Sequence, residues 1–322
     1  MSEIKTIGIL TSGGDAPGMN AAIRAVARAA MGNGMKVMGI KRGYHGLLRG
    51  EIEELTSRDV SDIIQRGGTF LQTARSKNFA TEEGVKKGVE VLKIFGIDAI
   101  VVIGGDGSFK GARDLANNGI ATVGIPGTID NDVGCTDYTI GYDTALNTAM
   151  EAIDKIRDTA SSHERCSVVE VMGRNAGYIP VSLAIANGAE AVMVPEYPYD
   201  LDEIKRNIIE GRNRGKRHYI IVVSEGVGGS GALCKNIEET TGIETRATVL
   251  GHMQRGGNPS VLDRVTATKM GAYAADLLAK GIYNRVVVQK DGKITDLDIN
   301  EALQTKKTLN KEELDLVERM SK

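Results

Sequence analysis

An apolar run that ends in a cluster of glycines constrains this chain more than any other feature. Residues 99–103 are uniformly apolar and rich in β-branched side chains, and the segment GGDGS at 104–108 follows directly. Such a run is typical of a parallel strand that is buried on both faces. Because the three glycines lack Cβ atoms, the backbone can take positive φ and bring its N–H groups close to phosphate oxygens. We expect Ser108 to cap a helix that begins near Phe109.

One carboxylate lies inside this glycine-rich loop. Asp106 would repel a bound phosphate unless a cation lay between them, and its hard oxygen ligand suits Mg²⁺. A tight turn from strand to helix with a solvated aspartate would give the same short motif. Asp106 therefore indicates a polyphosphate bound through a metal ion only if other loops of this kind lie beside it.

Two further apolar segments end in similar loops. Residues 120–125 lead into PGTIDND at 126–132, and residues 6–10 lead into TSGGDAPG at 11–18, with a helix expected over 20–31. In open parallel α/β sheets the carboxyl ends of the strands line the ligand crevice, so we expect the three loops to meet. Phosphoryl transfer to an alcohol also needs a base, which Asp130 can supply. Asp132 is a second candidate for the base, although a hydrogen-bonding, metal-shell or turn role suits it better.

Composition narrows the function classes. The 322 residues contain 41% hydrophobic residues and 40 glycines, enough for two α/β lobes. A net charge of −2 offers no overall attraction to nucleic acid or to an anionic membrane. Cys135, Cys166 and Cys234 have no Cys-x-x-Cys spacing, which favours reduced thiols over a zinc site. The N-terminal residues lead straight into a strand and no apolar run reaches membrane-spanning length, so we expect a cytoplasmic protein.

Six ordered motifs resemble those of the bacterial ATP-dependent 6-phosphofructokinase family. They are GILTSGGDAPGMN at 8–20, RGGT at 66–69, GGDGS at 104–108, PGTIDND at 126–132, EVMGR at 170–174 and LGHMQRGG at 250–257. GGDG alone is a weak signal, because NAD kinases and diacylglycerol kinases carry similar loops. Together the six motifs extend over nearly the whole chain.

Strand-like and helix-like segments alternate along the chain, which favours an α/β fold. The resemblance implies two doubly wound lobes, each with a mostly parallel sheet flanked by helices, and an active site in the cleft between them. It places an ATP-binding lobe at 1–140 plus 253–303 and a lobe that binds fructose 6-phosphate at 141–252 plus 304–322. Further strands are expected at 36–40, 167–172, 191–194 and 219–224, and a helix at 143–158, capped by Asp143 or Thr144.

The resemblance also implies the ATP contacts. They are Gly14, Tyr44, Arg75, Ser76, Gly105, Asp106, Gly107 and Ser108, with Asp106 positioning Mg²⁺. The ring of Tyr44 would lie against phosphate or adenosine, although a tyrosine that only packs a turn fits the local sequence equally well. Relatives that use pyrophosphate typically have Asp and Lys at the positions of Gly107 and Gly127, so glycine at both positions favours ATP.

On the sugar side, the resemblance makes Asp130 the base for the 1-hydroxyl and Arg174 the cation that stabilises the transferring phosphoryl group. Arg165 and Arg246 would reach the 6-phosphate of a neighbouring subunit in a homotetramer. The remaining implied contacts with the substrate are Thr128, which also counts as catalytic, Ile129, Met172, Gly173, Glu225, His252, Met253, Gln254 and Arg255.

An effector site for ADP or phosphoenolpyruvate is implied as well. Arg24 and Arg28 lie one turn apart on the expected helix 20–31 and form a cationic pair, which without the resemblance would be an exposed helix face. Some relatives have an effector-binding arginine where this chain has Ser57, with Arg58 beside it, so the identity of the effector stays open. The other implied members are Arg157, Gly188, Glu190, Arg214, Lys216, Arg217 and His218.

These observations predict an ATP-dependent 6-phosphofructokinase of glycolysis. A pyrophosphate-dependent phosphofructokinase is the rival enzyme, and the two glycines disfavour it. A catalytically silent nucleotide-sensing module is disfavoured by the presence of Asp106, Asp130 and Arg174 together. A dinucleotide-binding oxidoreductase is weaker still, because no Gly-x-Gly-x-x-Gly opens the first helix.

Overall fold

The computed structural model describes residues 4–321. Contacts between Cα atoms divide the chain into two compact units. The first contains residues 1–129, 133–144 and 255–307, and the second contains residues 130–132, 145–254 and 308–322. The chain thus crosses between the units several times, and the loop at 130–132 is grouped with the second unit.

The first unit is built on a seven-stranded sheet in the order β11-β10-β5-β4-β1-β2-β3. The five strands from β10 to β2 are parallel, and β11 and β3 join the two edges in antiparallel fashion. The strands are β1 (Thr6–Thr11), β2 (Lys36–Ile40), β3 (Ile52–Glu54), β4 (Ala99–Gly104), β5 (Ala121–Pro126), β10 (Arg285–Lys290) and β11 (Lys293–Asp298).

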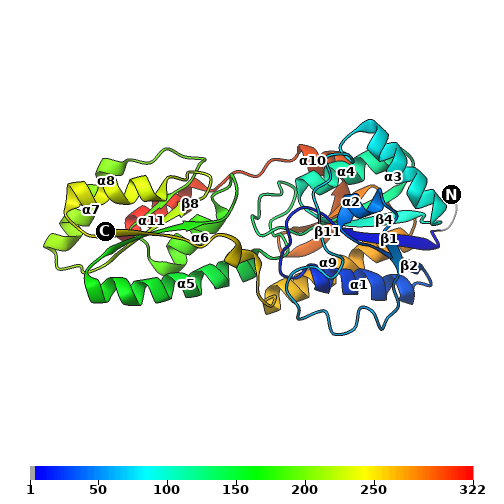
Figure 1. The fold of residues 1–322 in the computed structure, drawn as a ribbon, viewed down its shortest axis with the longest axis horizontal. Coiled ribbons are helices and arrows are strands. Elements are labelled where there is room, and N and C mark those ends of the chain that lie inside the picture. Colours follow the sequence, from blue (N-terminus) through cyan, green and yellow to red (C-terminus); the bar gives the residue numbers. More distant parts are fainter. Residues whose placement is uncertain (1–3, 322) are drawn as a thin grey trace. The chain divides into compact units, whose positions relative to one another are not determined.

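Helices cover both faces of this sheet (Figure 1). On one face α1 packs along α9, and on the other α4 packs against β4 and β5 with α2, α3 and α10 around it. Strand β4 is buried along its whole length, as its uniformly apolar sequence predicts. The helices are α1 (Met19–Gly32), α2 (Gly43–Leu47), α3 (Glu82–Ile94), α4 (Asp106–Asn117), α9 (Val261–Ala279) and α10 (Ile299–Gln304).

The second unit has a four-stranded parallel sheet in the order β7-β8-β6-β9. Helices α7 and α8 share a core with one face, and α6 and α11 pack together against β7 and β8 (Figure 1). The strands are β6 (Cys166–Val171), β7 (Ala191–Met193), β8 (Tyr219–Ser224) and β9 (Thr245–Val249). The helices are α5 (Tyr142–His163), α6 (Tyr178–Asn187), α7 (Leu201–Asn213), α8 (Ser230–Thr241), α11 (Lys311–Ser321) and the 3-10 helix η1 (Gly251–Arg255).

Two parallel sheets flanked by helices confirm the predicted fold class, and the expected strands are present with ends shifted by about one residue. Helix α5 is longer than the predicted 143–158 because it continues to His163. None of the helices within residues 4–321 combines the length and the apolar character that crossing a membrane requires.

The local geometry predicted for the GGDGS loop was wrong in two respects. Helix α4 begins at Asp106 with Gly105 as N-cap, so Ser108 lies inside the first turn and caps nothing; its hydroxyl donates instead to the carbonyl oxygen of Ser12 at 3.0 Å. Gly104, Gly105 and Gly107 all have negative φ. The absence of a Cβ matters there for space rather than for backbone freedom.

Candidate active site and effector residues

The N-terminus of α4 offers open space beside Asp106. A Cβ added to Gly107 would meet nothing within 4 Å, and one added to Gly105 would meet only the side chain of Thr128, at 3.9 Å. Gly104 differs, because a Cβ there would overlap the Ser108 hydroxyl and the Ser12 carbonyl oxygen. Asp106 and Gly107 are exposed at the first turn, where the partial positive charge of the helix favours an anion.

The loop after β1 lies directly against this turn. The N–H of Ser12 donates to the carbonyl of Ile103 at 2.9 Å, which continues the pairing of β1 with β4 into the loop. Arg255 reaches the same loop, where its guanidinium donates to the carbonyl of Asp15 at 3.2 Å. A Cβ at Gly14 would lie 2.9 Å from the guanidinium carbon of Arg255, so a larger residue there would displace the end of the arginine side chain.

The loop after β5 completes the group. The N–H of Gly127 donates to the carbonyl of Gly104 at 3.0 Å, and the Thr139 hydroxyl donates to the carbonyl of Thr128 at 2.6 Å. Ile129 is fully buried and Asp130 is 5% exposed. The three strand-end loops therefore meet, as predicted, and carry Asp106 and Thr128 at one edge of the first unit's sheet.

Tyr44 lies beneath this edge. Its ring stacks on Phe79 with centroids 4.1 Å apart and is 6% exposed, and its hydroxyl donates to the carbonyl of Ser108 at 2.7 Å. Burial raises the pKa of the Tyr44 hydroxyl, which keeps it a neutral donor. Tyr44 thus contacts the predicted phosphate loop from its buried side. Of the other predicted ATP contacts, Arg75 is exposed, and the hydroxyl of Ser76 accepts from the N–H of Phe79.

In the second unit, Glu225 organises the end of β6. Its carboxylate accepts from the N–H of Arg174 at 2.6 Å and of Gly173 at 3.3 Å, and Arg174 has a positive φ of 58°. Gln254, which is fully buried, accepts from the N–H of Met172 at 2.8 Å. Residues 172–174 thus hold a bend that leaves Arg174 and Glu225 exposed, while His252 and Met253 are exposed on η1.

Arg165 and Arg246 share a partner that no sequence motif indicated. Glu244 accepts from Nε of Arg165 at 2.8 Å and from Nε of Arg246 at 2.9 Å. The pairing of β6 with β9 brings the two arginines to one place. Hydrogen bonds from Arg165 and then Arg246 hold the pKa of the Glu244 carboxyl below its usual value.

Several predicted effector residues also gather in the second unit. Arg157 lies 3.1 Å from Nε2 of His218, and Lys216 forms an ion pair of 2.5 Å with the buried carboxylate of Glu190. Burial and the nearby Arg157 lower the pKa of His218. A cavity of about 550 Å³ is lined by Glu190, Lys216 and Arg214 among others.

Two other predicted effector residues adjoin this group in the second unit, and two belong to the first unit. Gly188 ends α6 in a left-handed conformation, and Arg217 lies 3.9 Å from Glu164. Arg24 and Arg28 lie on α1 of the first unit, where Arg28 donates to the carbonyl of Ser57 at 3.4 Å.

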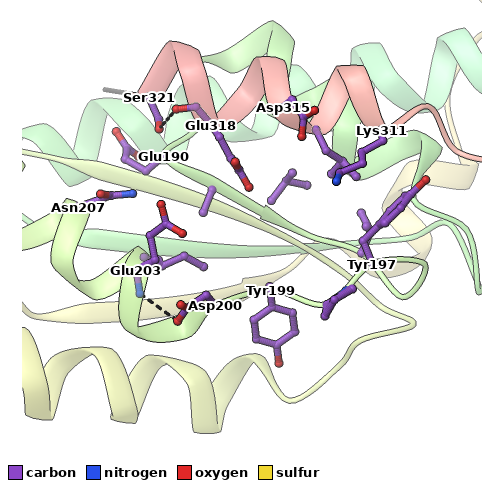
Figure 2. Close-up of a pocket in the computed structure, with 16 residues that line it drawn as sticks. Glu190, Tyr197, Tyr199, Asp200, Glu203, Asn207, Lys311, Asp315, Glu318 and Ser321 are labelled. Carbon is purple, nitrogen blue, oxygen red and sulfur yellow. Dashed lines mark hydrogen bonds between the residues drawn. The ribbon is translucent and has the colours of Figure 1, made fainter.

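Another cavity, of about 300 Å³, lies between the end of β7, α7 and α11. Figure 2 shows Tyr197 and Tyr199 at its wall together with the carboxylates of Glu203, Asp315 and Glu318. Glu190 alone among the predicted site residues lines it, so this cavity stands apart from the predicted chemistry.

A protein-only metal cage is not present in residues 4–321, since no three His, Cys, Asp or Glu side chains gather there. A single exposed carboxylate beside an open helix N-terminus suits Mg²⁺ nonetheless. This ion is usually held by one or two carboxylates together with substrate phosphates and water. The donor set at Asp106 therefore fits a metal that arrives with a nucleotide.

Comparisons with known proteins agree with one another. A family model described as Phosphofructokinase matches residues 6–278. The curated "ATP-dependent 6-phosphofructokinase" of Clostridium botulinum (strain Hall) is 56% identical over 319 residues, which is 99% of this chain and 100% of the relative. The protein of the same name from Clostridium acetobutylicum matches to the same extent.

Solved structures are similar as well. The phosphofructokinase of Pichia pastoris in the T-state matches with a TM-score of 0.88 and 34% identity over 100% of this chain, which spans only 39% of that longer chain. The phosphofructokinase of Saccharomyces cerevisiae matches with a TM-score of 0.87 and 34% identity over 93% of this chain and 45% of that chain. A pyrophosphate-dependent phosphofructokinase from Marinobacter aquaeolei (TM-score 0.85, 21% identity, 98% and 91% covered) shares the fold.

Proposed function

The chain belongs to the phosphofructokinase family, and from this premise we propose how it works as an ATP-dependent 6-phosphofructokinase. It transfers the γ-phosphoryl group of ATP to the 1-hydroxyl of fructose 6-phosphate, which gives fructose 1,6-bisphosphate and ADP. The observation that carries the proposal is the meeting of three strand-end loops, which presents Asp106 at a helix N-terminus and Thr128 beside it. Helix N-termini and glycine-rich loops bind phosphates through backbone N–H groups.

The donor is ATP rather than pyrophosphate. The open space at Gly107 leaves room for the α-phosphate, whereas an aspartate there would place a like charge beside it. The full-length curated relatives carry ATP-dependent in their names, while the pyrophosphate-dependent neighbour supports the fold alone.

Asp130 is the general base in this proposal. Its carboxylate takes the proton of the sugar 1-hydroxyl as that oxygen forms a bond to the γ-phosphorus and the bond from phosphorus to the β,γ-bridging oxygen breaks. Thr128 orients the hydroxyl, and Arg174 faces the negative charge on the transferring group. Asp106 would hold Mg²⁺, which would supply positive charge beside the phosphates of the nucleotide.

The units divide the ligands between them. The first unit binds the nucleotide through the loops that follow β1 and β4, and the exposed Arg174 and Glu225 of the second unit bind the sugar. Arg165 and Arg246 recognise the 6-phosphate of a neighbouring subunit's substrate, since arginine suits bidentate phosphate contacts. Three exposed apolar side chains at the start of α9, Val261 (79% exposed), Leu262 (47%) and Val265 (44%), support assembly into a homotetramer.

A regulatory site for ADP or phosphoenolpyruvate is proposed around the second unit's cationic cluster. Lys216 pairs with the buried Glu190, Arg157 lies against His218, and Arg214 lines the adjoining cavity. Clustered arginine and lysine side chains suit a phosphate-bearing ligand. We also place the enzyme in the cytoplasm, which the buried free thiols of Cys135, Cys166 and Cys234 support.

One coupled assay tests the activity. Fructose 1,6-bisphosphate production is followed with fructose 6-phosphate and either ATP, GTP or pyrophosphate, each with Mg²⁺. We expect turnover with ATP and none above background with pyrophosphate. Turnover with pyrophosphate alone would reverse the donor assignment, and no turnover with any donor would support a silent nucleotide-sensing module.

A further inference from the structure

Asp263, near the start of α9, carries a buried carboxylate that accepts four hydrogen bonds. The side chain is 0% exposed. One oxygen accepts from the Tyr138 hydroxyl at 2.6 Å and from the N–H of Gly141 at 2.6 Å. The other accepts from the N–H of Thr144 at 2.9 Å and from its hydroxyl at 2.5 Å. Burial raises the pKa of the Asp263 carboxyl, and the same donors pull it back toward the charged form.

All four donors belong to one short segment, residues 138–144, which contacts two of the three strand-end loops. The Thr139 hydroxyl donates to the carbonyl of Thr128 at 2.6 Å, and the N–H of Ile140 donates to the carbonyl of Pro126 at 3.0 Å. A Cβ on Gly141 would come within 2.6 Å of the Ala16 side chain, so the segment also packs closely on the loop after β1.

We propose that Asp263 is a positioning residue for phosphoryl transfer: it fixes residues 138–144, and through Thr139 this segment fixes the backbone at Thr128, two residues before Asp130. The inference rests on the proposed role of Asp130. Four donors converging on one charged acceptor make a rigid anchor, because charge-assisted hydrogen bonds are stronger than neutral ones. A base must lie within hydrogen-bonding reach of its proton, and a misplacement of about 1 Å can cost about 100-fold in rate.

The chain offers graded variants for the test. Asp263→Asn keeps the shape of the side chain but replaces one accepting oxygen by an amide that donates. Thr139→Val removes only the hydroxyl that reaches Thr128, and Thr139→Ser restores it. Asp276→Asn is the matched control, because Asp276 lies on the same helix, is exposed and bonds to Asn33 rather than to residues 138–144.

We expect kcat to fall by roughly 10- to 100-fold in Asp263→Asn and in Thr139→Val, with KM for ATP changed less than about threefold. Thr139→Ser should recover most of the rate, and Asp276→Asn should match the parent. In an Asp130→Asn background, where the base is already lost, both substitutions should lower kcat by a clearly smaller factor. A purely structural role would reduce the active fraction equally in both backgrounds.

The outcomes separate the two proposals. A folded Thr139→Val enzyme with the parent's kcat would overturn the positioning role, even if Asp263→Asn fails to fold. An equal loss in both backgrounds would overturn it as well, because Asp263 would then act independently of Asp130. If Asp130→Asn alone has the parent's kcat, Asp130 is not the base. Asp263 then cannot act by positioning it.

Discussion

Arg165 donates its Nε–H to the carboxylate of Glu244 over 2.8 Å, and the same carboxylate also holds Arg246. These are the two arginines that we assign to a substrate phosphate of a neighbouring subunit. Glu244 therefore brings both cations close together. A phosphate that binds both arginines must compete with this carboxylate.

Glu244 gives a prediction for acid stability. Because hydrogen bonds from Arg165 and Arg246 lower the pKa of this carboxyl in the folded protein, the unfolded chain binds the proton more readily. The stabilisation is complete above the unfolded value of 4.5 and is lost as the pH falls through the lower folded value. As the pH falls below ~4.5, Glu244→Gln should therefore lose stability less steeply than the parent, and above that pH the two proteins should show the same pH dependence. Urea titrations at several pH values measure this, and parallel curves for the two proteins would contradict it.

We expect Gly107→Asp to weaken nucleotide binding without lowering the stability of the fold. A Cβ added at this position would meet nothing within 4 Å and the backbone has negative φ, so the melting temperature should stay close to that of the parent. KM for ATP should rise by about tenfold or more, because the new carboxylate lies where we place the α-phosphate and like charges in a binding site cost several kcal/mol. Gly231→Asp is the control for added charge, because Gly231 is also the second residue of a helix, is exposed, has negative φ and would have nothing within 4 Å of an added Cβ. An unchanged KM for ATP would mean that the nucleotide does not bind at the N-terminus of α4.

The effector assignment predicts a loss of regulation without a loss of chemistry. In Arg24→Ala/Arg28→Ala the response to ADP or phosphoenolpyruvate should disappear while kcat at saturating substrate stays near the parent's. The two arginines lie on α1, and the guanidinium of Arg28 donates to the carbonyl of Ser57 rather than to a strand-end loop. Effector titrations on the parent and on an Arg28→Lys variant, which retains the charge, provide the comparison. If the titration curves of the parent and the double variant overlay, Arg24 and Arg28 do not bind the effector and are simply exposed residues of α1.

The sequence was sufficient for the parts of the fold that depend on local pattern. Strands β1, β4 and β5 have largely apolar sequences, and their loops were therefore predicted to meet. The start of α4 was misplaced because the Ser108 hydroxyl bonds to Ser12, 96 residues away, while Gly105 takes the cap position. That competition between a local cap and a tertiary contact has no sequence signature.

The sequence also did not indicate hydrogen-bond partners that lie far apart along the chain. Glu244 lies 79 residues from Arg165, and Asp263 lies 122 residues from Gly141, so each pairing depends on strands or helices that only the fold brings together. A single carboxylate in a helix or strand pattern is most often solvated, and nothing local distinguished these two. The carboxylates of Glu244 and Asp263 are thus recognised by their hydrogen-bond donors and not by their neighbours in sequence.

Mixed oligomers test whether the active site is shared between subunits. Asp130→Ser should lower kcat by the roughly 10²- to 10⁴-fold typical of a lost general base, and Arg246→Ala should suppress activity at modest fructose 6-phosphate by removing a phosphate contact. The first chain retains Arg246 and the second retains Asp130. If Arg246 serves the neighbour's substrate, some sites in a hybrid receive an intact base from one chain and an intact arginine from the other.

We therefore expect activity to return when the two variants are unfolded and refolded together, although each is nearly inactive when refolded alone. A mixture of Asp130→Ser with Asp130→Asn is the control, because no hybrid site can then contain a base. Size-exclusion chromatography of the refolded samples establishes that they assemble equally. Activity no higher than the average of the two parents would mean that each site is built within one chain, and the proposed contribution of Arg246 to its neighbour would be wrong.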